Sequence, residues 1–478
     1  MSDKMLKFTT LSQKQPSKRK VGDRRQDWDE IYKEFLKPDA KGQSSRCSQC
    51  GIPFCQIHCP LHNNIPDWLM LTASGRLREA YDLSSSTNNF PEICGRICPQ
   101  DRLCEGNCVI DKGFESVTIG AVEKHITDTA FKNGWVKPIK PGVEKSNSVG
   151  IIGAGPAGLA AAETLRGFGY KVCIYDRYDR AGGLLIYGIP NFKLEKEIVN
   201  RRVRLISDSG VSFKLNFEVG RDATLEQLRL KHDAVLIATG AYAGRDLALP
   251  GRELPNVINA LDYLTASNRK GLGDVVPMFE NGALNAENKR VVVIGGGDTA
   301  MDCVRTAIRQ NAKSVYCLYR RDRTNMPGSM QEVSHAEEEG VNFEWLATPE
   351  AFLGEEYLKA VRVAKVHLGV ADSSGRQAPK KIPESSSELD ADLAICALGF
   401  DPEDLPKIFN APKLKASNWG TIKIDWSKMM TSIDGVFAAG DIVRGASLVV
   451  WAIKDGRDAA RAIHDYVMSK NYIEAEAS

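Results

Sequence analysis

The sequence predicts an α/β protein in which two dinucleotide-binding units of the Rossmann type follow a small helical domain. Two stretches, 149–177 and 290–319, each combine a short apolar run, a glycine-rich turn and a segment with apolar residues at helical spacing. Ahead of them, eight of the twelve cysteines fall between Cys47 and Cys108. Such a cluster in a large chain indicates metal or redox chemistry rather than a disulfide scaffold.

The composition is that of a globular protein of several domains. A chain of 478 residues is too long for one core, and about three domains are expected. The net charge of +2 gives no reason to propose a nucleic-acid or membrane partner. The sequence has no run of about 18 apolar residues, and its N-terminus lacks the apolar core of a secretory signal. We therefore expect a cytoplasmic protein.

The first unit carries a glycine pattern suited to a dinucleotide. Gly153 allows a tight turn, Gly155 lets the backbone approach a pyrophosphate, and Gly158 lets the helix pack close to the sheet. The next apolar run, 171–175, ends in Asp176, which is placed to accept a hydrogen bond from a ribose hydroxyl. An ordinary glycine-rich turn is the alternative, but the flanking strand, helix and acid favour a nucleotide site. The turn is Gly153-Ala154-Gly155-Pro156-Ala157-Gly158.

The second unit repeats the pattern with a different ending. Gly295 and Gly297 follow an apolar run, and Ala300 takes the place of the third glycine. The next strand, 314–319, ends in Arg320-Arg321-Asp322-Arg323 instead of an acid. An acid would repel a 2′-phosphate, whereas arginine pairs with one in a bidentate manner. This ending predicts NADPH rather than NADH.

The cysteines form two quartets, which suggests two metal centres. Thiolates at this spacing can converge on one centre, and the Cys-x3-Cys-Pro ending at Cys59 resembles ferredoxin motifs whose last cysteine serves the other cluster. Structural zinc is the alternative, with His58 and His62 nearby, but zinc does no redox work. We therefore favour iron–sulfur clusters and expect both histidines to be loop residues. The quartets are Cys47, Cys50, Cys55 and Cys59, then Cys94, Cys98, Cys104 and Cys108; Cys173, Cys303, Cys317 and Cys396 are expected to be small hydrophobes.

Other segments connect these units. Residues 27–36 place Trp28, Ile31, Tyr32 and Phe35 on one side of a predicted helix. Further predictions are helical periodicity over 65–83, a linker over 136–148 and an exposed hairpin or loop over 371–388.

Three further segments suit a flavin-like ligand. Residues 181–194, with Gly183, could press backbone against a flat ring, or form a plain loop. Asp441, after a strand and Gly440, could bind a ribityl hydroxyl. A predicted helix over 447–462 would direct its N-terminal dipole at negative charge on a reduced flavin.

Together these stretches resemble the small (β) subunits of bacterial NADPH-dependent glutamate synthases. The resemblance runs from Asp27 to about Tyr466 and rests on both cysteine quartets, GAGPAG, AGGLLIYGIPNFKL, GGGDTAMDC, YRRDRTNMPGS and GVFAAGDIVRGASLVVWAI. The same module resembles the NADPH-oxidising part of dihydropyrimidine dehydrogenase and the flavoprotein subunit of ferredoxin:NADP bifurcating enzymes. The motifs therefore specify the half-reaction better than the electron acceptor.

The resemblance implies a fold with the NADPH domain inserted into the FAD domain. The expected divisions are 1–145 for a helical domain with two clusters, 146–250 and 393–478 for the FAD domain, and 251–392 for the NADPH domain. The implied FAD residues are Gly153, Gly155, Pro156, Ala157, Gly158, Asp176, Gly183, Gly240, Gly440, Asp441, Ser447, Val449 and Trp451. The implied NADPH residues are Gly295, Gly297, Asp298, Thr299, Arg320 and Arg321.

The resemblance also implies two [4Fe-4S] clusters and a division of labour. One cluster would be held by Cys47, Cys50, Cys55 and Cys108, and the other by Cys59, Cys98, Cys104 and Glu123, which leaves Cys94 free. NADPH would reduce FAD without an amino-acid base, and the clusters would pass electrons to a large subunit that makes glutamate from glutamine and 2-oxoglutarate. The rival hypotheses are a reductase serving ferredoxin or pyrimidine reduction and a nucleotide-sensing zinc protein.

Overall fold

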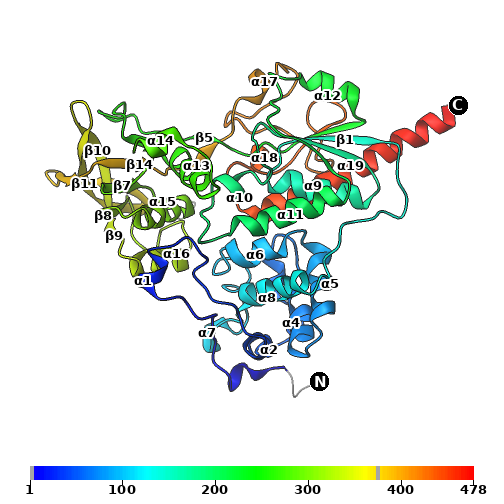
Figure 1. Ribbon diagram of the computed structural model, residues 1–478, viewed down its shortest axis with the longest axis horizontal. Helices are drawn as coiled ribbons and strands as arrows, with labels where there is room; N and C mark the ends of the chain where they lie inside the picture. The colour runs from blue at the N-terminus through cyan, green and yellow to red at the C-terminus, as the bar shows by residue number, and fades with distance from the viewer. Residues whose placement is uncertain (1–4, 373–376, 478) are drawn as a thin grey trace.

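The structure is a computed structural model that describes residues 5–372 and 377–477. Cysteine-rich helices form the lower part of Figure 1, and two sheet-containing domains lie side by side above them. We call these parts the cysteine domain, the first nucleotide domain (right) and the second nucleotide domain (left). The α/β class predicted from the glycine patterns is confirmed.

The cysteine domain is built from short helices around the buried Trp68, which is 0% exposed. Proline stands in the first turn of α2, α4 and α6. The backbone N–H that proline lacks would have no partner inside the helix at this position, so no helical hydrogen bond is lost. The predicted helical stretch 65–83 is two helices, because Gly75 turns the chain with φ +79° between them. The helices are α2 (Lys37–Ser44), α3 (Phe54–Ile57), α4 (Ile65–Ala73), α5 (Leu77–Thr87), α6 (Pro91–Ile97), α7 (Asp111–Phe114) and α8 (Ile119–Lys132).

The N-terminal strap, residues 13–36, corrects one prediction. Residues 27–36 contain no helix, and α1 (Val21–Arg24) is the helix of the strap. The apolar side chains that suggested helical spacing separate instead, since Trp28 meets the Phe192 ring at 6.2 Å and the Tyr32 hydroxyl bonds His335 Nε2 at 2.9 Å. Contacts with different domains override the local periodicity. A 3₁₀ helix, η2 (Lys7–Thr9), precedes the strap.

The first nucleotide domain has a parallel sheet with the strand order β16-β4-β1-β2-β3. The long helix α19 packs along α9 and carries the C-terminus outward (Figure 1). It begins at Val449, two residues later than predicted. The elements are β1 (Ser148–Ile152), α9 (Pro156–Gly167), β2 (Lys171–Tyr175), α10 (Leu184–Tyr187), α11 (Lys196–Asp208), β3 (Ser212–Lys214), α12 (Leu225–Lys231), β4 (Ala234–Ile237), α17 (Leu405–Ile408), β16 (Val436–Ala438), α18 (Asp441–Arg444) and α19 (Val449–Ala477).

The second nucleotide domain is inserted between β4 and β16. Its parallel sheet has the order β6-β14-β7-β8-β9. Since β14 ends at Cys396 within this sheet, we propose a domain boundary after that residue instead of at 392. The elements are β6 (Val257–Asn259), α13 (Ala260–Gly271), α14 (Pro277–Glu280), β7 (Arg290–Ile294), α15 (Asp298–Arg309), β8 (Ser314–Tyr319), α16 (Met330–Glu338), β9 (Asn342–Trp345) and β14 (Leu393–Cys396).

Two smaller sheets lie in the second nucleotide domain and at the point where the chain passes between the two nucleotide domains. An antiparallel sheet contains β10 (Ala347–Gly354), β11 (Leu358–Ala371), β12 (Gln377–Lys381) and β13 (Ser387–Asp390). The predicted hairpin over 371–388 falls here, although residues 373–376 lie outside the described residues. Where the chain leaves and re-enters the first domain, β5 (Ala243–Gly244) pairs with β15 (Phe400–Asp401). In the described parts of the chain, no helix has the length and apolar character needed to cross a membrane.

A buried charge cluster joins the strap to the second nucleotide domain. Glu339, 0% exposed, accepts hydrogen bonds from Arg305 at 2.9 and 3.0 Å and from Arg309 at 2.6 and 3.1 Å. The Arg24 guanidinium lies 4.0 Å from the same carboxylate. Despite its burial, the side-chain hydrogen bonds and charges of the two bonded arginines hold the pKa of Glu339 down at about 2.

We expect Glu339→Gln to lower the apparent free energy of unfolding by about 3–5 kcal/mol, because it leaves buried arginines without their counter-charge. A carboxyl with a lowered pKa stabilises the fold above its unfolded pKa near 4.5, and that stability is lost as the pH falls toward 2. The difference between variant and wild type, measured by urea unfolding, should therefore shrink below pH 4.5. Glu388→Gln is the control, since its pair with Arg362 is exposed. Equal losses for the two variants would contradict the assignment.

Candidate functional site

The first glycine turn has the geometry that a bound pyrophosphate requires. Gly153 has φ +110°, and a Cβ there would lie 2.3 Å from the carbonyl oxygen of Ala238. A Cβ at Gly158 would lie 2.0 Å from the carbonyl oxygen of Gly153, so the helix must approach the strand closely. Nothing lies within 4 Å of a Cβ built at Gly155. The turn thus presents open backbone at the N-terminus of α9, where a phosphate fits.

Asp176 lies at the end of β2, as predicted. Its carboxylate accepts the Ala154 N–H at 2.6 Å and the Tyr178 N–H at 2.8 Å, which ties it to the glycine turn. Burial raises the pKa of this carboxyl. Asp176 also lines a cavity with Gly153 and Thr239, and the buried Thr239 Oγ1 has no hydrogen-bond partner among the described residues. An unsatisfied hydroxyl beside a glycine turn suits a polar ligand.

Glycines from distant segments close around the first turn. Gly183 has φ +54°, and a Cβ there would lie 2.9 Å from the Cα of Gly155. Gly440 has φ +79°, and a Cβ there would lie 2.9 Å from the Cβ of Ala157. Gly240, with φ +78°, ends the β4 segment near the same sheet edge. These positions form a cradle that side chains would fill.

The C-terminal part of the first site contains Asp441 at the start of α18. Burial raises the pKa of its carboxyl to about 7, although the Ser447 N–H donates to it and lowers the pKa. Ser447 is exposed, Val449 opens α19, and the half-buried Trp451 ring lies 4.4 Å from the Arg444 guanidinium. The N-terminus of α19 therefore lies close in sequence and space to Asp441, in keeping with the predicted dipole.

The second glycine turn repeats the geometry of the first. Gly295 has φ +147°, and a Cβ there would lie 2.2 Å from the carbonyl oxygen of Ala397. Nothing lies within 4 Å of a Cβ at Gly297, and Ala300 is completely buried. Asp298 and Thr299 open α15, and Asp298 Oδ1 accepts the Ser329 N–H at 2.9 Å.

The two predicted phosphate-binding arginines follow β8 directly. Arg320 is exposed and makes no ion pair within residues 5–372 and 377–477. Arg321 is partly buried, and its Nε donates to the carbonyl oxygen of Gln377 at 3.3 Å. Among the described residues, the Arg320 guanidinium is therefore unpaired, whereas that of Arg321 is held by one hydrogen bond to Gln377.

The cysteines separate into two cavities that do not follow the sequence quartets. Cys108, from the second quartet, lines the first cavity, whereas Cys59, from the first quartet, lines the second. Cys59 thus lies where the crossover predicted from the Cys-Pro ending would require it. The first cavity is lined by Cys47, Cys50, Cys55 and Cys108, and the second by Cys59, Cys94, Cys98, Cys104 and Glu123.

These cavities suit a group larger than one ion. Among the described residues, no three His, Cys, Asp or Glu side chains are close enough to share a single metal ion. Burial raises the pKa of Cys47 to about 11, of Cys55 to about 12 and of Cys59 to about 11, so an uncoordinated site would hold thiols. Several thiols around one cavity are the kind of ligand set that an iron–sulfur cluster uses. His58 and His62 are exposed, as expected of loop residues.

The second cavity distinguishes Glu123 from Cys94. Glu123 Oε1 accepts from the side-chain amides of Asn63 at 3.1 Å and Asn88 at 3.3 Å, and burial raises the carboxyl pKa to about 8. The Cys94 thiol, 3% exposed, donates to Asn88 Oδ1 at 3.8 Å. Trp68 Nε1 donates to Asn63 Oδ1 at 3.2 Å. The Glu123 carboxyl group is therefore held by a buried network, and the Cys94 thiol is hydrogen-bonded to Asn88. Neither asparagine could be predicted from the sequence, because neither carries a spacing signal.

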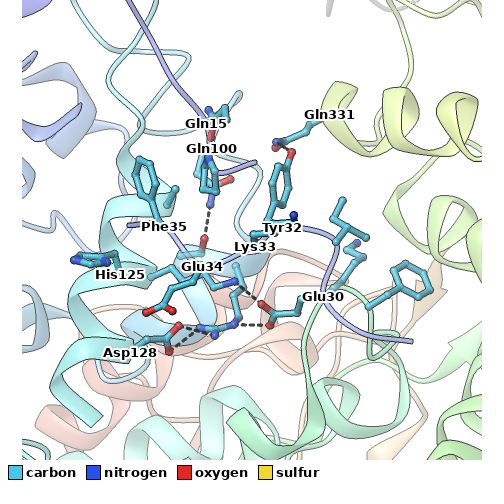
Figure 2. Close-up of a pocket in the computed structure, with 18 of the residues that line it drawn as sticks. Gln15, Glu30, Tyr32, Lys33, Glu34, Phe35, Gln100, His125, Asp128 and Gln331 are labelled. Atoms are coloured by element: carbon cyan, nitrogen blue, oxygen red, sulfur yellow. Dashed lines mark hydrogen bonds and ion pairs between the residues drawn. The ribbon is translucent and has the colours of Figure 1, made fainter. Parts of the chain in front are cut away.

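Another cavity, of about 150 Å³, lies between the strap and α8. The Arg96 guanidinium donates to Glu30 at 2.6 Å and to Asp128 at 2.8 Å. Figure 2 shows Glu30 and Asp128 among the residues that line this cavity. Lys124 also pairs with Glu30. Since these charges satisfy one another, we interpret them as the attachment of the strap to the cysteine domain.

Comparisons with known proteins agree with this arrangement. Residues 24–135 match a family described as dihydropyrimidine dehydrogenase domain II, 4Fe-4S cluster, and residues 147–456 match the pyridine nucleotide-disulphide oxidoreductases.

Relatives match over nearly the whole chain. The glutamate synthase [NADPH] small chain of Azospirillum brasilense is 63% identical over 98% of each chain. The protein of the same name from Escherichia coli is 43% identical over 98% of this chain and 100% of that one. Among solved structures, Mycobacterium tuberculosis FprA in complex with NADPH shares the fold, with a TM-score of 0.58, 20% identity and coverage of 69% of this chain and 86% of that one.

Proposed function

Because the chain belongs to the family of glutamate synthase [NADPH] small chains, we propose that it is the electron-input subunit of a glutamate synthase. It is an NADPH-dependent oxidoreductase with FAD and [4Fe-4S] clusters. The observation that carries this function is the combination, on one chain, of two open glycine turns with two cysteine-lined cavities. When bound, FAD would supply hydride chemistry with NADPH, and the clusters would supply one-electron transfer.

The residues of the nucleotide domains bind and orient the two nucleotides. The turn at Gly155 and the N-terminus of α9 hold the FAD pyrophosphate, and Asp441 holds the ribityl chain. The turn at Gly297 and α15 hold the NADPH pyrophosphate, while Arg320 and Arg321 hold the 2′-phosphate. Positioning, not proton transfer, is the contribution of these side chains.

The cysteine domain provides two sets of cluster ligands. Its first cavity holds one cluster through four thiolates. Its second cavity holds the other through three thiolates and the Glu123 carboxylate, which Asn63 and Asn88 orient. The ligand sets are Cys47, Cys50, Cys55 and Cys108, then Cys59, Cys98, Cys104 and Glu123.

The electrons leave through the first cavity to a large subunit. Exposed apolar side chains lie next to its ligands in the sequence, on helix α3 and the adjoining loops: Ile52 is 65% exposed, Phe54 47%, Ile57 48% and Val109 53%. Phe54 and Val109 line the same cavity as Cys50 and Cys108. Apolar surface of this kind marks an interface, and here it surrounds the ligands of the first cluster. None of the twelve cysteines, all of which lie in the described residues, forms a disulfide, which suits a reducing cytoplasm.

The test is a reconstitution with the large subunit of a bacterial glutamate synthase. The purified holo-chain should oxidise NADPH with a tetrazolium dye as acceptor. With glutamine and 2-oxoglutarate it should form no glutamate until the large subunit is added, because its domains are occupied by the two nucleotide sites and the cluster cavities. Glutamate formed by this chain alone would refute the division of labour. Dye reduction with no response to the large subunit would indicate another acceptor.

A further inference from the structure

The second cysteine loop reaches directly into the second nucleotide domain. Asp101 and Arg102 lie between Cys98 and Cys104, which line the second cavity. Arg102 Nη2 donates to the carbonyl oxygen of Met326 at 3.1 Å and to that of Gly328 at 2.6 Å. These acceptors lie in the loop 322–329, which follows Arg321 and precedes α16. We call it the bridging loop.

Asp101 completes the contact by capping α16. Its Oδ2 accepts the Met330 N–H at 3.2 Å, and its Oδ1 accepts the Ser329 hydroxyl at 3.3 Å. The first N–H groups of a helix have no partners inside the helix, and Ser329 makes no side-chain cap of its own. A carboxylate from the cysteine domain therefore accepts one of the free N–H groups at the start of α16.

The bridging loop rests on the second glycine turn. The Gly328 N–H donates to the carbonyl oxygen of Gly296 at 2.9 Å, and a Cβ at Gly328 would lie 3.1 Å from that oxygen. The Ser329 N–H donates to Asp298, the first residue of α15. One continuous set of hydrogen bonds thus runs from the second cysteine loop, through the bridging loop, to the turn that receives a nucleotide.

The strap fixes the other side of α16. Lys18 and Arg24 pair with Glu338 at 2.7 and 2.8 Å, and the Tyr32 hydroxyl bonds His335 at 2.9 Å and accepts from Gln331 at 2.6 Å. Figure 1 shows α16 at the lower edge of the second nucleotide domain, facing α1 and the cysteine domain. With α16 anchored along its length, the bridging loop has little freedom to move away from Gly296.

We propose that Asp101 and Arg102 are positioning residues that hold the bridging loop, and with it the adjacent Arg320 and Arg321, in the conformation that binds NADPH. Both residues act through their hydrogen bonds to the bridging loop and to α16. Through them, the loop that carries the second cluster's ligands and the nicotinamide-nucleotide site are mechanically linked. The inference rests on the proposed function, which places NADPH at this turn.

The test measures NADP⁺ affinity of the holoenzyme by calorimetry. We expect Arg102→Ala to raise the dissociation constant for NADP⁺ about tenfold, since it removes two charge-assisted hydrogen bonds. FAD and iron content should remain those of the wild type, and kcat with a dye at saturating NADPH should change far less than KM. Arg102→Lys should recover part of the affinity. Asp101→Asn, which keeps the shape and removes the charge, should weaken binding severalfold.

A control variant and a spectroscopic measurement test whether the loss of affinity is specific to the bridging loop. Arg76→Ala removes an exposed arginine that pairs with Glu79 inside the cysteine domain, and it should leave the affinity unchanged. NADP⁺ should alter the electron paramagnetic resonance signal of the reduced second cluster in the wild type and not in Arg102→Ala. Wild-type affinity in both the Arg102→Ala and Asp101→Asn variants would overturn the inference. A wild-type protein that binds no NADP⁺ would instead refute the proposed function.

Discussion

Cys98→Ser should remove one of two iron–sulfur clusters and lower the iron content from about eight to about four atoms per chain. The residue lines the second cavity, and a serine oxygen is a poor replacement for a thiolate on iron. Cys94→Ala should keep about eight irons, although Cys94 lines the same cavity. Its thiol donates to Asn88 Oδ1, and we assign the fourth ligand position to Glu123. Iron and acid-labile sulfide assays on anaerobically purified protein measure both effects.

The two variants control for each other, because each removes one thiol from the same cavity. FAD content should be equal in both, since the first glycine turn belongs to another domain. With Cys98→Ser, electron delivery to the large subunit should fall by orders of magnitude, while dye reduction near the flavin persists. Loss of iron in Cys94→Ala with full retention in Cys98→Ser would reverse the ligand assignment. If the wild type contained zinc and no acid-labile sulfide, the assignment of iron–sulfur clusters to both cavities would be wrong.

Local signals explain why the nucleotide folds could be predicted. A glycine turn between an apolar strand and a helix is encoded within about 30 residues, and the predicted run 171–175 coincides with β2. The same holds for the run from Arg290, which became β7 and α15. Insertion of one nucleotide domain into the other is a long-range property, and it came from the family resemblance alone.

Residues 27–36 show where local reasoning failed. Their apolar spacing is helical, but Trp28 packs on Phe192 of the first nucleotide domain and Tyr32 bonds His335 of the second. Gly75 divided another predicted helical stretch, because its positive φ ends α4. In both cases, tertiary contacts or a turn determined the backbone conformation, and the apolar pattern did not.

The candidate site also combines features that are local in the sequence with contacts that are distant in it. Cysteine spacing predicted two centres and the crossover of Cys59, because ligand spacing is a local feature. The role of Asn88 depends on Glu123, which is 35 residues away, and that of Arg102 on Gly328, which is 226 residues away. Neither residue belongs to a motif, so their contacts could be found only in the folded chain.

Replacing Arg320 and Arg321 together with alanine should weaken NADPH binding about ten- to a hundredfold and leave NADH binding nearly unchanged. A charge-assisted contact to a phosphate contributes on the order of 1.5–3 kcal/mol, and each 1.4 kcal/mol is a factor of ten. NADH lacks the 2′-phosphate, so it loses nothing at this position. The ratio of kcat/KM for the two nucleotides, with a dye as acceptor, measures the change.

The two single variants should weaken NADPH binding to different extents, because the two arginines have different surroundings. Arg321 is tied to the Gln377 carbonyl, whereas Arg320 is exposed and unpaired in the described residues. We therefore expect Arg320→Ala to account for most of the loss. Arg323→Ala is the comparison within the same loop: its guanidinium pairs with Glu337 at 2.5 Å, so its effect on NADPH should be several times smaller. Equal weakening of NADPH and NADH in the double variant would show that these arginines support the loop and do not select the phosphate.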